Sequence, residues 1–365
     1  MKFIPLAQPF FIGKEIKYVT DCIKSTWVRS GKFVTLFEKS LAKFCNVLYA
    51  SSTSNGTSAL HLVLLALNIK SGDEVLVPDI TYVATANTIT YTGARPVFVD
   101  VDRNTWNMDA EKIEEKITKN TKAIIPVHLY GHPADMDAIN KVAKKYNISV
   151  IEDACQALGA LYKGKKIGSL SKAACFSFSG PKIITTGEGG MVVSNDKKLM
   201  ENINAIKNDF ASTKRRYYHS NIGYNYRLTN LQAALGYAQF KTMNLRVITK
   251  IRNANIYNSL LQNENVIQTQ MQKSWAKSSF WLYSIVIRKN GLRDKLIEYL
   301  KKKNVETRPF FVSLHKLPMY KNKEKLLNSE YISENGISLP SSLDMTKSDI
   351  EYICSEIKKF ISKNA

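Results

Sequence analysis

The sequence predicts an α/β protein with a large, mostly parallel sheet flanked by helices and a smaller α+β unit at the C-terminal end. Two observations lead to this prediction. Short apolar stretches alternate with helical ones in the first part of the chain, and this alternation stops after Arg227. Strands that alternate with helices are joined by right-handed crossovers, which produce parallel sheets covered on both faces. We therefore expect a large α/β domain over residues 1–240 and a small domain over residues 241–365.

The first elements follow from the spacing of apolar residues. Apolar positions from Phe33 to Phe44 are separated by four, four and three residues, as on one face of an amphipathic helix. Apolar runs predict strands at residues 74–77, 96–101, 122–127 and 148–152. Helices are expected at residues 61–67, 84–91, 110–117 and 136–146. In such a sheet, ligands bind at the C-terminal ends of the strands.

The elements after Arg227 are of mixed type. The sequence predicts a long helix at residues 229–260, a strand at residues 280–287, and helices at residues 292–303 and 348–361. Helices and a strand without regular alternation are typical of an α+β unit.

Composition excludes several classes of protein. The five cysteines are scattered and form no C-x-x-C pair, so we expect neither a disulfide framework nor a metal cluster, and a cytoplasmic location suits them. The start of the chain lacks a signal-peptide pattern, and no apolar stretch is long enough to span a membrane. The net charge of +21 would attract polyanions, but the lysines are spread along the chain without a nucleic-acid-binding motif. We expect no nucleic-acid partner.

A candidate anion site lies in the motif SNGTSALHL at residues 54–62, where a small polar turn runs into an apolar helical pattern. The unpaired N–H groups at a helix N-terminus attract anions. Gly56, Thr57 and Ser58 are therefore candidate phosphate ligands. The alternative is an ordinary helix start that is capped by Asn55 or Thr57.

A candidate acid follows the predicted strand at residues 148–152. Asp153 lies at the C-terminal end of that strand, and Gln156 follows three residues later. An acid in this place suits the ring nitrogen of pyridoxal phosphate, because a protonated ring withdraws electrons from the carbanion formed in amino transfer. Gln156 would then be within reach of the ring hydroxyl. The alternative role for Asp153 is a helix cap or a structural ion pair.

A candidate nucleophile lies in the segment CFSFSGPKIITTGEGGMVVSN. This segment combines a strand, a break at Gly180 and Pro181, Lys182, a glycine-rich turn and a second strand. A lysine that binds a carbonyl group covalently needs a rigid turn and a partly neutral amine. A surface lysine after a turn is the commonplace alternative. The order of Thr57, Asp153 and Lys182 along one alternating chain favours a pyridoxal phosphate site.

Six long motifs resemble a known family. They are SNGTSALHL, PDITYVATAN, PVHLYGHPADMD, IEDACQALGA, FSFSGPKIITTGEGGMV and GYNYRLTNLQAA. In this order they resemble the DegT/DnrJ/EryC1/StrS family of sugar aminotransferases. The resemblance is greatest to the branch that aminates a GDP-linked 4-keto-6-deoxyhexose, and it extends to RYYHSNIGYNYR, SFWLYSI and ETRPFFVSLHKLPMY. It implies a pyridoxal-phosphate-dependent enzyme of fold type I whose active sites lie at the interface of a homodimer.

The resemblance also implies roles for individual residues. Lys182 would bind the cofactor covalently and then act as acid and base, and Asp153 would pair with the ring nitrogen. Gln156 would bond the ring hydroxyl, and Tyr82 would stack on the ring. The cofactor phosphate would be bound by Thr57, Ser58, Ser177 and, from the partner subunit, Asn225.

The resemblance implies a second group of residues that contact the nucleotide sugar. They are Trp27, Arg29, Arg308 and His315. Arginine suits a diphosphate because its planar group donates paired hydrogen bonds. For Arg308 and His315 the alternative is a solvated loop.

The remaining histidines have weaker cases. His128 and His132 are candidates either for substrate contact or for packing at a strand end. His61 is expected to pack within its helix. No independent argument gives His219 a role.

Two departures from the family pattern leave the identity of the sugar open. Ser179 and Pro181 stand beside the lysine in FSFSGPK, where that branch has an aromatic residue and an asparagine. The second departure is DACQA in place of DCAEA. A different branch, the sugar 3-dehydratases, has histidine at the position of Lys182, so the lysine argues against that branch.

The expected reaction moves an amino group from L-glutamate to the 4-keto group of a nucleotide-linked 4-keto-6-deoxyhexose. One alternative is the same reaction on a UDP- or dTDP-linked 4-keto-6-deoxyglucose, with a viosamine-type product, or amination of a 3-keto sugar. An alternative of another class is a regulatory protein without catalytic activity that binds a polyanion on the same fold.

Overall fold

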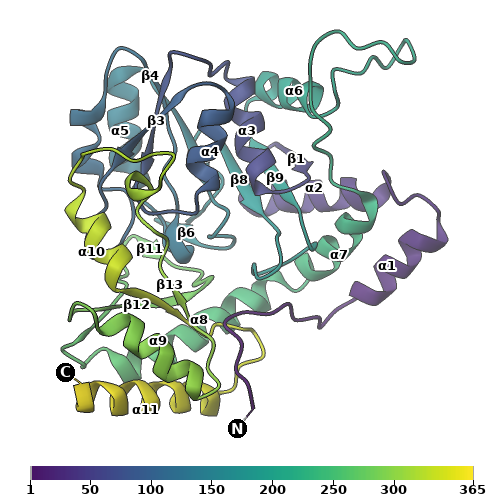
Figure 1. Cartoon of the computed structure of the whole chain (residues 1–365). Helices are drawn as coiled ribbons and strands as arrows, with labels where there is room; N and C mark the ends of the chain where they lie inside the picture. Colours follow the sequence, from purple (N-terminus) through teal and green to yellow (C-terminus); the bar gives the residue numbers. More distant parts are fainter. Residues whose placement is uncertain (1, 365) are drawn as a thin grey trace.

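A seven-stranded sheet forms the centre of the N-terminal part of the chain (Figure 1). The computed structural model describes residues 2–364. The strands are β1 (Tyr49–Thr53), β2 (Glu74–Pro78), β3 (Arg95–Val99), β4 (Thr121–Ile124), β5 (Ser149–Asp153), β8 (Ala173–Ser177) and β9 (Gly190–Ser194). They lie in the order β1-β9-β8-β5-β4-β2-β3. Of these strands only β9 runs against its neighbours, which confirms the prediction of a mostly parallel sheet.

Helices cover both faces of this sheet. One face packs against α3 (Gly56–Ala66), α4 (Ala84–Tyr91) and α6 (Lys197–Ile206), and the other against α2 (Lys32–Cys45), α5 (Met136–Tyr146) and α7 (Asn230–Phe240). Adjacent residues of β2 show why both faces need cover. Val75 and Leu76 are both fully buried, yet they belong to separate clusters on opposite faces. Side chains alternate between the two faces of a strand, so an apolar run requires helices on both sides.

Two predicted helices differ from the structure. Residues 110–117 form two short 3₁₀ turns, Ala110–Lys112 and Glu114–Lys116, instead of one α-helix. Only Ile113 of this stretch is fully buried, so there is no apolar stripe to hold a helix against the core. The predicted helix at residues 229–260 is two helices, because α7 ends at Phe240 and α8 (Met243–Leu261) begins in a new direction towards the second sheet.

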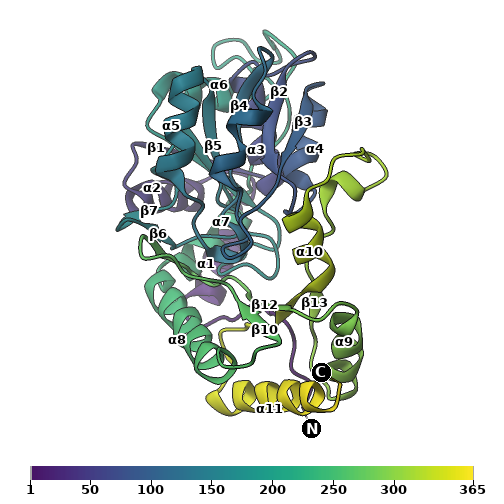
Figure 2. The same ribbon diagram turned by 90° about the vertical axis from the view of Figure 1, so that its left-hand side faces the viewer.

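A four-stranded antiparallel sheet forms the C-terminal part. Its order is β10 (Ile267–Thr269), β12 (Tyr283–Ile287), β14 (Gly336–Leu339) and β13 (Arg308–Pro309). Figure 2 shows α8, α9 (Leu292–Lys302) and α11 (Lys347–Asn364) around this sheet, with α10 (Leu327–Asn335) reaching towards the first sheet. The sheet and these helices share a separate apolar core that includes Ile285, Leu296 and Ile353. None of the helices within residues 2–364 is both long and apolar enough to cross a membrane.

The two parts are joined at several points. Strand β11 (Ala276–Lys277) pairs with β6 (Leu161–Tyr162) in a small third sheet that also contains β7 (Lys165–Lys166). Near the N-terminus, Ile4 pairs with Val305 and belongs to the C-terminal core. We propose that the domain boundary lies at residues 240/241, as expected from the sequence, and that the segment around Ile4 is counted with the second domain.

Candidate active site

The C-terminal ends of the parallel strands enclose a cavity of about 440 Å³. It lies where β2, β5 and β8 end and where α3 begins after β1. Sequence analysis had singled out eight of its lining residues, and these come from positions far apart in the chain. They are Gly56, Thr57, Tyr82, Asp153, Gln156, Ser177, Lys182 and Arg308.

Lys182 lies in the turn that connects the antiparallel pair β8 and β9. The backbone N–H of Lys182 donates to the carbonyl of Ser179 at 3.1 Å. Further along the turn, the side chain of Gln239 on α7 donates to the carbonyl of Thr185 at 2.6 Å and accepts from its N–H at 3.1 Å. Because both ends of the turn are fixed in this way, the lysine projects from a rigid base, as the sequence predicted.

The amine of Lys182 is poorly solvated. Burial lowers the pKa of Lys182 from its ordinary value to about 8, although the charges of Cys155 and Asp153 oppose this shift. The amine lies 3.5 Å from the ring centroid of Trp281, a residue of the C-terminal domain. At a pKa near 8 a substantial fraction of the amine is neutral at physiological pH, which is the state required of a nucleophile or a base.

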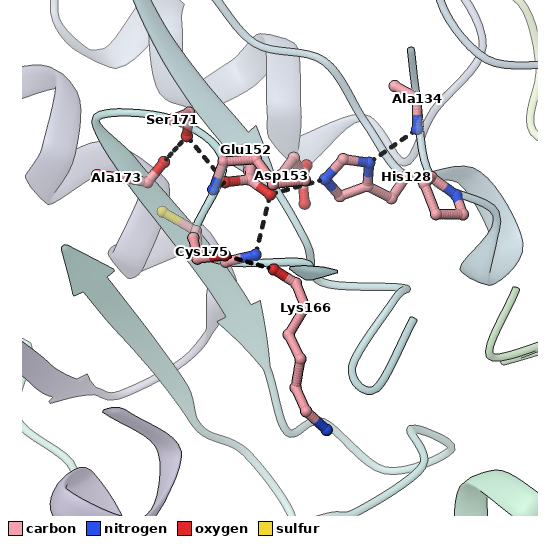
Figure 3. A network of polar contacts seen from close by, with 12 residues as sticks. His128, Ala134, Glu152, Asp153, Lys166, Ser171, Ala173 and Cys175 are labelled. Atoms are coloured by element: carbon pink, nitrogen blue, oxygen red, sulfur yellow. Dashed lines mark hydrogen bonds and ion pairs between the residues drawn. The ribbon is translucent and has the colours of Figure 1, made fainter. Parts of the chain in front are cut away.

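Asp153 is held in place at the end of β5. Its carboxylate accepts a hydrogen bond from the hydroxyl of Thr85 at 2.8 Å and one from the N–H of Cys155 at 3.1 Å. The side chain of the neighbouring Glu152 is fully buried and makes other contacts, which Figure 3 shows. Glu152 lies 3.2 Å from His128 and accepts from the N–H of Gly168 at 2.9 Å. Asp153 thus lines the cavity, while Glu152, one residue earlier, bonds the end of β5 to the loop at Gly168.

His128 and His132 are packed at the end of β4 and are both buried. His128 accepts from the N–H of Ala134 at 3.0 Å, so its other ring nitrogen carries the proton that faces Glu152. His132 contacts Asn107, and burial lowers its pKa to about 4. Neither residue lines the cavity, which favours strand-end packing over substrate contact.

The N-terminus of α3 forms one wall of the cavity. Asn55 caps the helix by accepting from the N–H of Ser58 at 2.8 Å. The N–H groups of Gly56 and Thr57 precede the first hydrogen-bonded turn and have no partner within the helix. A Cβ atom at Gly56 would lie 2.8 Å from Cβ of Ser177 and 2.9 Å from Sγ of Cys155. Only glycine allows this close approach. The Asn55 cap uses the N–H of Ser58, so it is compatible with an anion bound at the N–H groups of Gly56 and Thr57.

These features fit pyridoxal phosphate. The cavity offers an amine of lowered pKa, a carboxylate that is anchored by Thr85, and a helix N-terminus pressed against a serine hydroxyl. They correspond to the aldehyde, ring nitrogen and phosphate of the cofactor, respectively.

Five predicted site residues lie outside the lining of this cavity. Ser58 and Asn225 line an adjoining hollow of about 400 Å³ together with His61, which is buried among tyrosine rings. Trp27 is 66% exposed on the surface. Arg29 lines a separate polar hollow of about 510 Å³ together with Lys207 and Arg227.

The fifth such residue, His315, is fully buried, unlike the solvated loop residue considered as its alternative. Its ring lies 2.7 Å from one oxygen of Asp79, and its backbone N–H donates to the other at 2.9 Å. Its second ring nitrogen lies 3.3 Å from Glu330. Burial opposes protonation of the ring, but the hydrogen bond and charge of Asp79 raise its pKa above the ordinary value. His315 thus fastens the C-terminal domain to the end of β2, three residues before Tyr82.

Sequence analysis missed several lining residues. Thr85 orients Asp153, and the lining also includes Glu188, Trp281 and Phe311. The motifs that contain Glu188, Trp281 and Phe311 carried the family resemblance, but spacing alone gave no reason to place them beside Lys182. The segment before β12 brings Trp281 to the cavity from the second domain, and the segment after β13 brings Phe311.

Comparisons with known proteins match this geometry. A sequence model of the DegT/DnrJ/EryC1/StrS aminotransferase family matches residues 11–358. The chain is 45% identical to a GDP-perosamine synthase of Escherichia coli O157:H7, over 99% of this chain and 100% of that protein, and 41% identical to one of Caulobacter vibrioides, over 98% of both. A putative sugar aminotransferase of Streptococcus pneumoniae, Spr1654 in its PMP-form, superimposes with a TM-score of 0.94 at 27% identity, over 99% of this chain and 98% of that one.

Replacement of Gly56 by alanine tests the close approach at the start of α3. The added Cβ would push Ser177 and Cys155 away, so Gly56→Ala should weaken the binding of pyridoxal phosphate by about 5- to 100-fold, as overpacking costs about 1–3 kcal/mol. Absorbance titration of the apoprotein measures this affinity. Gly180→Ala is the matched control, because a Cβ at Gly180 meets no atom within 4 Å. Equal affinities of the two variants would contradict the assignment.

Replacement of His315 by glutamine tests the buried pair with Asp79. A folded-state pKa that is raised contributes stability that is complete below the ordinary imidazole pKa of about 6.5 and disappears as the pH rises through the raised value. His315→Gln should therefore lower the free energy of unfolding by about 1–3 kcal/mol more at pH 6 than at pH 9. Urea unfolding at both pH values measures the difference. Equal losses for His315→Gln at both pH values would refute the charged pair.

Proposed function

The chain belongs to the DegT/DnrJ/EryC1/StrS aminotransferase family, and from this premise we propose that it aminates the 4-keto group of a GDP-linked 4-keto-6-deoxyhexose. It is a sugar aminotransferase that depends on pyridoxal phosphate. The observation that carries the proposal is Lys182, whose pKa is lowered to about 8 in a cavity that also presents Asp153 and the N-terminus of α3. The names of the two GDP-perosamine synthases support the choice of nucleotide and sugar.

Each predicted cofactor ligand that lines the cavity has a proposed role. Pyridoxal phosphate, when bound, withdraws electrons from the reacting carbon and carries the amino group between donor and acceptor. Lys182 would hold it covalently, Asp153 would keep its ring nitrogen protonated, and Tyr82 would cover its ring. Gln156 would bond the ring hydroxyl, a role compatible with the bond that its side-chain oxygen already accepts from the N–H of Tyr130 at 3.0 Å. The phosphate would be bound by Gly56, Thr57 and Ser177.

Lys182 would also move the protons of the reaction. Once released from the cofactor, its neutral Nζ takes the α-proton of the donor, which we propose to be L-glutamate, and the donor leaves as 2-oxoglutarate. In the second half of the cycle Nζ delivers a proton to the carbon that bore the keto group of the sugar. A base works best with a pKa near the operating pH, and a pKa of about 8 meets this condition.

We propose that the active enzyme is a homodimer with shared active sites. Arg308 is the one predicted substrate ligand that lines the cavity of its own chain, and it would bind the diphosphate. Trp27, Arg29 and Asn225 lie on surfaces outside that cavity, where they could serve a second copy, and the buried Ser58 lines the same hollow as Asn225. In this arrangement Asn225 of the partner subunit would complete the phosphate site. His315 would fix the Tyr82 loop instead of contacting the sugar.

The reaction is proposed to take place in the cytoplasm. All five cysteines are free thiols, four of them buried, which suits a reducing compartment.

Replacement of Lys182 by alanine tests the central assignment. Lys182→Ala should abolish turnover, by about 10³-fold or more, because it removes both the covalent anchor and the base. It should also abolish the near-visible absorbance of the bound cofactor. Lys166→Ala is the matched control, since Lys166 likewise lies over an aromatic ring, that of Phe44, but away from the cavity. Retention of turnover and absorbance in Lys182→Ala would refute the proposed function.

A substrate panel tests the choice of nucleotide. With L-glutamate as donor, kcat/KM should be at least about 10-fold higher for the GDP-linked 4-keto-6-deoxyhexose than for UDP- and dTDP-linked 4-keto sugars, since a site built for one polar base leaves its groups unpaired with another. Product masses from parallel assays measure the ratio. Preference for a dTDP- or UDP-linked sugar would favour a viosamine-type product. A colourless protein without pyridoxal phosphate uptake would favour a regulatory protein.

A further inference from the structure

Trp281 holds a position beside Lys182 that the proposed roles leave unexplained. The amine of Lys182 lies 3.5 Å from the centroid of the indole ring. Within residues 2–364, the contact of this amine with the Trp281 ring is not accompanied by an ion pair or a hydrogen bond to an oxygen atom. An aromatic face is thus the close partner of an amine whose pKa is lowered to about 8.

The indole ring is fixed to the turn that carries the lysine. Its N–H donates to the carbonyl oxygen of Pro181 at 2.9 Å, and Pro181 directly precedes Lys182. Ring and amine are therefore tied to the same short stretch of backbone.

The backbone of Trp281 is held by a buried lysine of its own domain, Lys250. Lys250 on α8 donates from Nζ to the carbonyl oxygen of Trp281 at 3.0 Å and also to that of Ser341. Tyr130 stacks near the indole with ring centroids 6.2 Å apart and an angle of 28°. Gly131 permits this approach, because it has a φ of +106° and a Cβ there would lie 2.9 Å from the N–H nitrogen of Trp281. The ring is consequently fixed by both domains.

The face of an indole attracts an ammonium group more than a neutral amine. The attraction is strongest where water is excluded, and it favours the protonated state. Desolvation of Lys182 has the opposite effect and favours the neutral state. Of the other ionisable side chains that line the cavity, Cys155 and Asp153 also favour the charged amine. The remaining ones are Tyr82, Glu188 and Arg308.

We propose that the indole of Trp281 is the resting position of the Lys182 amine whenever this amine is not joined to the cofactor. The inference rests on the proposed function. After Nζ has taken the α-proton of the donor it is an ammonium group, and the indole face holds it within reach of the reacting carbons until it returns that proton. Trp281 is thus a positioning residue that also keeps the pKa of the free lysine from falling further.

Competitive acetylation of the apoprotein tests the contact without any substrate. The protein is labelled with acetic anhydride between pH 6 and pH 10, and peptide mass mapping gives the labelling midpoint of Lys182. In Trp281→Leu, which keeps an apolar side chain but removes the aromatic face, the midpoint should fall by about one pH unit. Trp281→Phe keeps a weaker face and should show a smaller fall in the same direction. Trp275→Phe, outside the cavity, should match the wild type.

The outcomes separate this proposal from the proposed function. A midpoint in Trp281→Leu that is unchanged, or that rises, contradicts the role of the indole, even if the wild type aminates a nucleotide sugar. A lowered midpoint in a protein that aminates no sugar supports the contact and contradicts the function. If Trp281→Leu does not fold, Trp281→Phe carries the test, and an unchanged midpoint in that variant overturns the proposal.

Steady-state kinetics test the catalytic consequence. Trp281→Phe should lower kcat by about 10-fold with little change in KM for the nucleotide sugar, since the ring acts on the freed lysine and not on substrate binding. The pH optimum should move to lower pH along with the labelling midpoint. A change in KM alone would assign Trp281 to substrate binding and refute the proposed role.

Discussion

The constraint on which the site depends is that one amine must be kept in a dry cavity without an oxygen partner. A carboxylate in contact with Lys182 would hold it charged and make it useless as a nucleophile. The carboxylate of Asp153, one of the two acids that line the cavity, instead accepts hydrogen bonds from the hydroxyl of Thr85 and the N–H of Cys155. Its charge still acts on the lysine, but burial outweighs it and the pKa settles near 8. The separation of acid and base allows each to have its own protonation state at the same pH.

The two domains supply different parts of this site. The first sheet supplies the groups that must be rigid, because Asp153, Ser177 and the Lys182 turn all follow from the ends of its strands. The second domain covers them with Trp281, Arg308 and Phe311, which brings low polarity and a positive charge over the opening. The contact of His315 with Asp79 fastens this cover at the strand end that precedes Tyr82. Both domains are therefore needed for the environment of one lysine.

Features that depend on a local sequence pattern could be predicted from the sequence. The alternation of apolar strands and helices predicted the sheet, and the ends of its strands located Asp153 and Lys182 correctly beside the start of α3. The composition of segment 110–117 allows a helix, which the sequence therefore predicts. The segment forms two 3₁₀ turns instead, because it has no stripe of buried residues to pack against the core. Trp281 and His315 could not be placed from spacing. Their surroundings are created by residues 100 or more positions away, Pro181 in one case and Asp79 in the other.

The residues left outside the cavity follow a common pattern. Arg29 lies in a polar hollow whose nearby cations include Lys207 and Arg227, with Glu38 as the carboxylate of its lining. Asn225 lies in a second hollow at the outer side of α3, where its side chain accepts from Arg227. Three cations beside a single carboxylate repel one another unless an anion or another protein surface binds there. A homodimer in which each chain places these residues near the other's nucleotide sugar would remove that repulsion, and it would explain why the cavity of one chain contains a single arginine for a diphosphate.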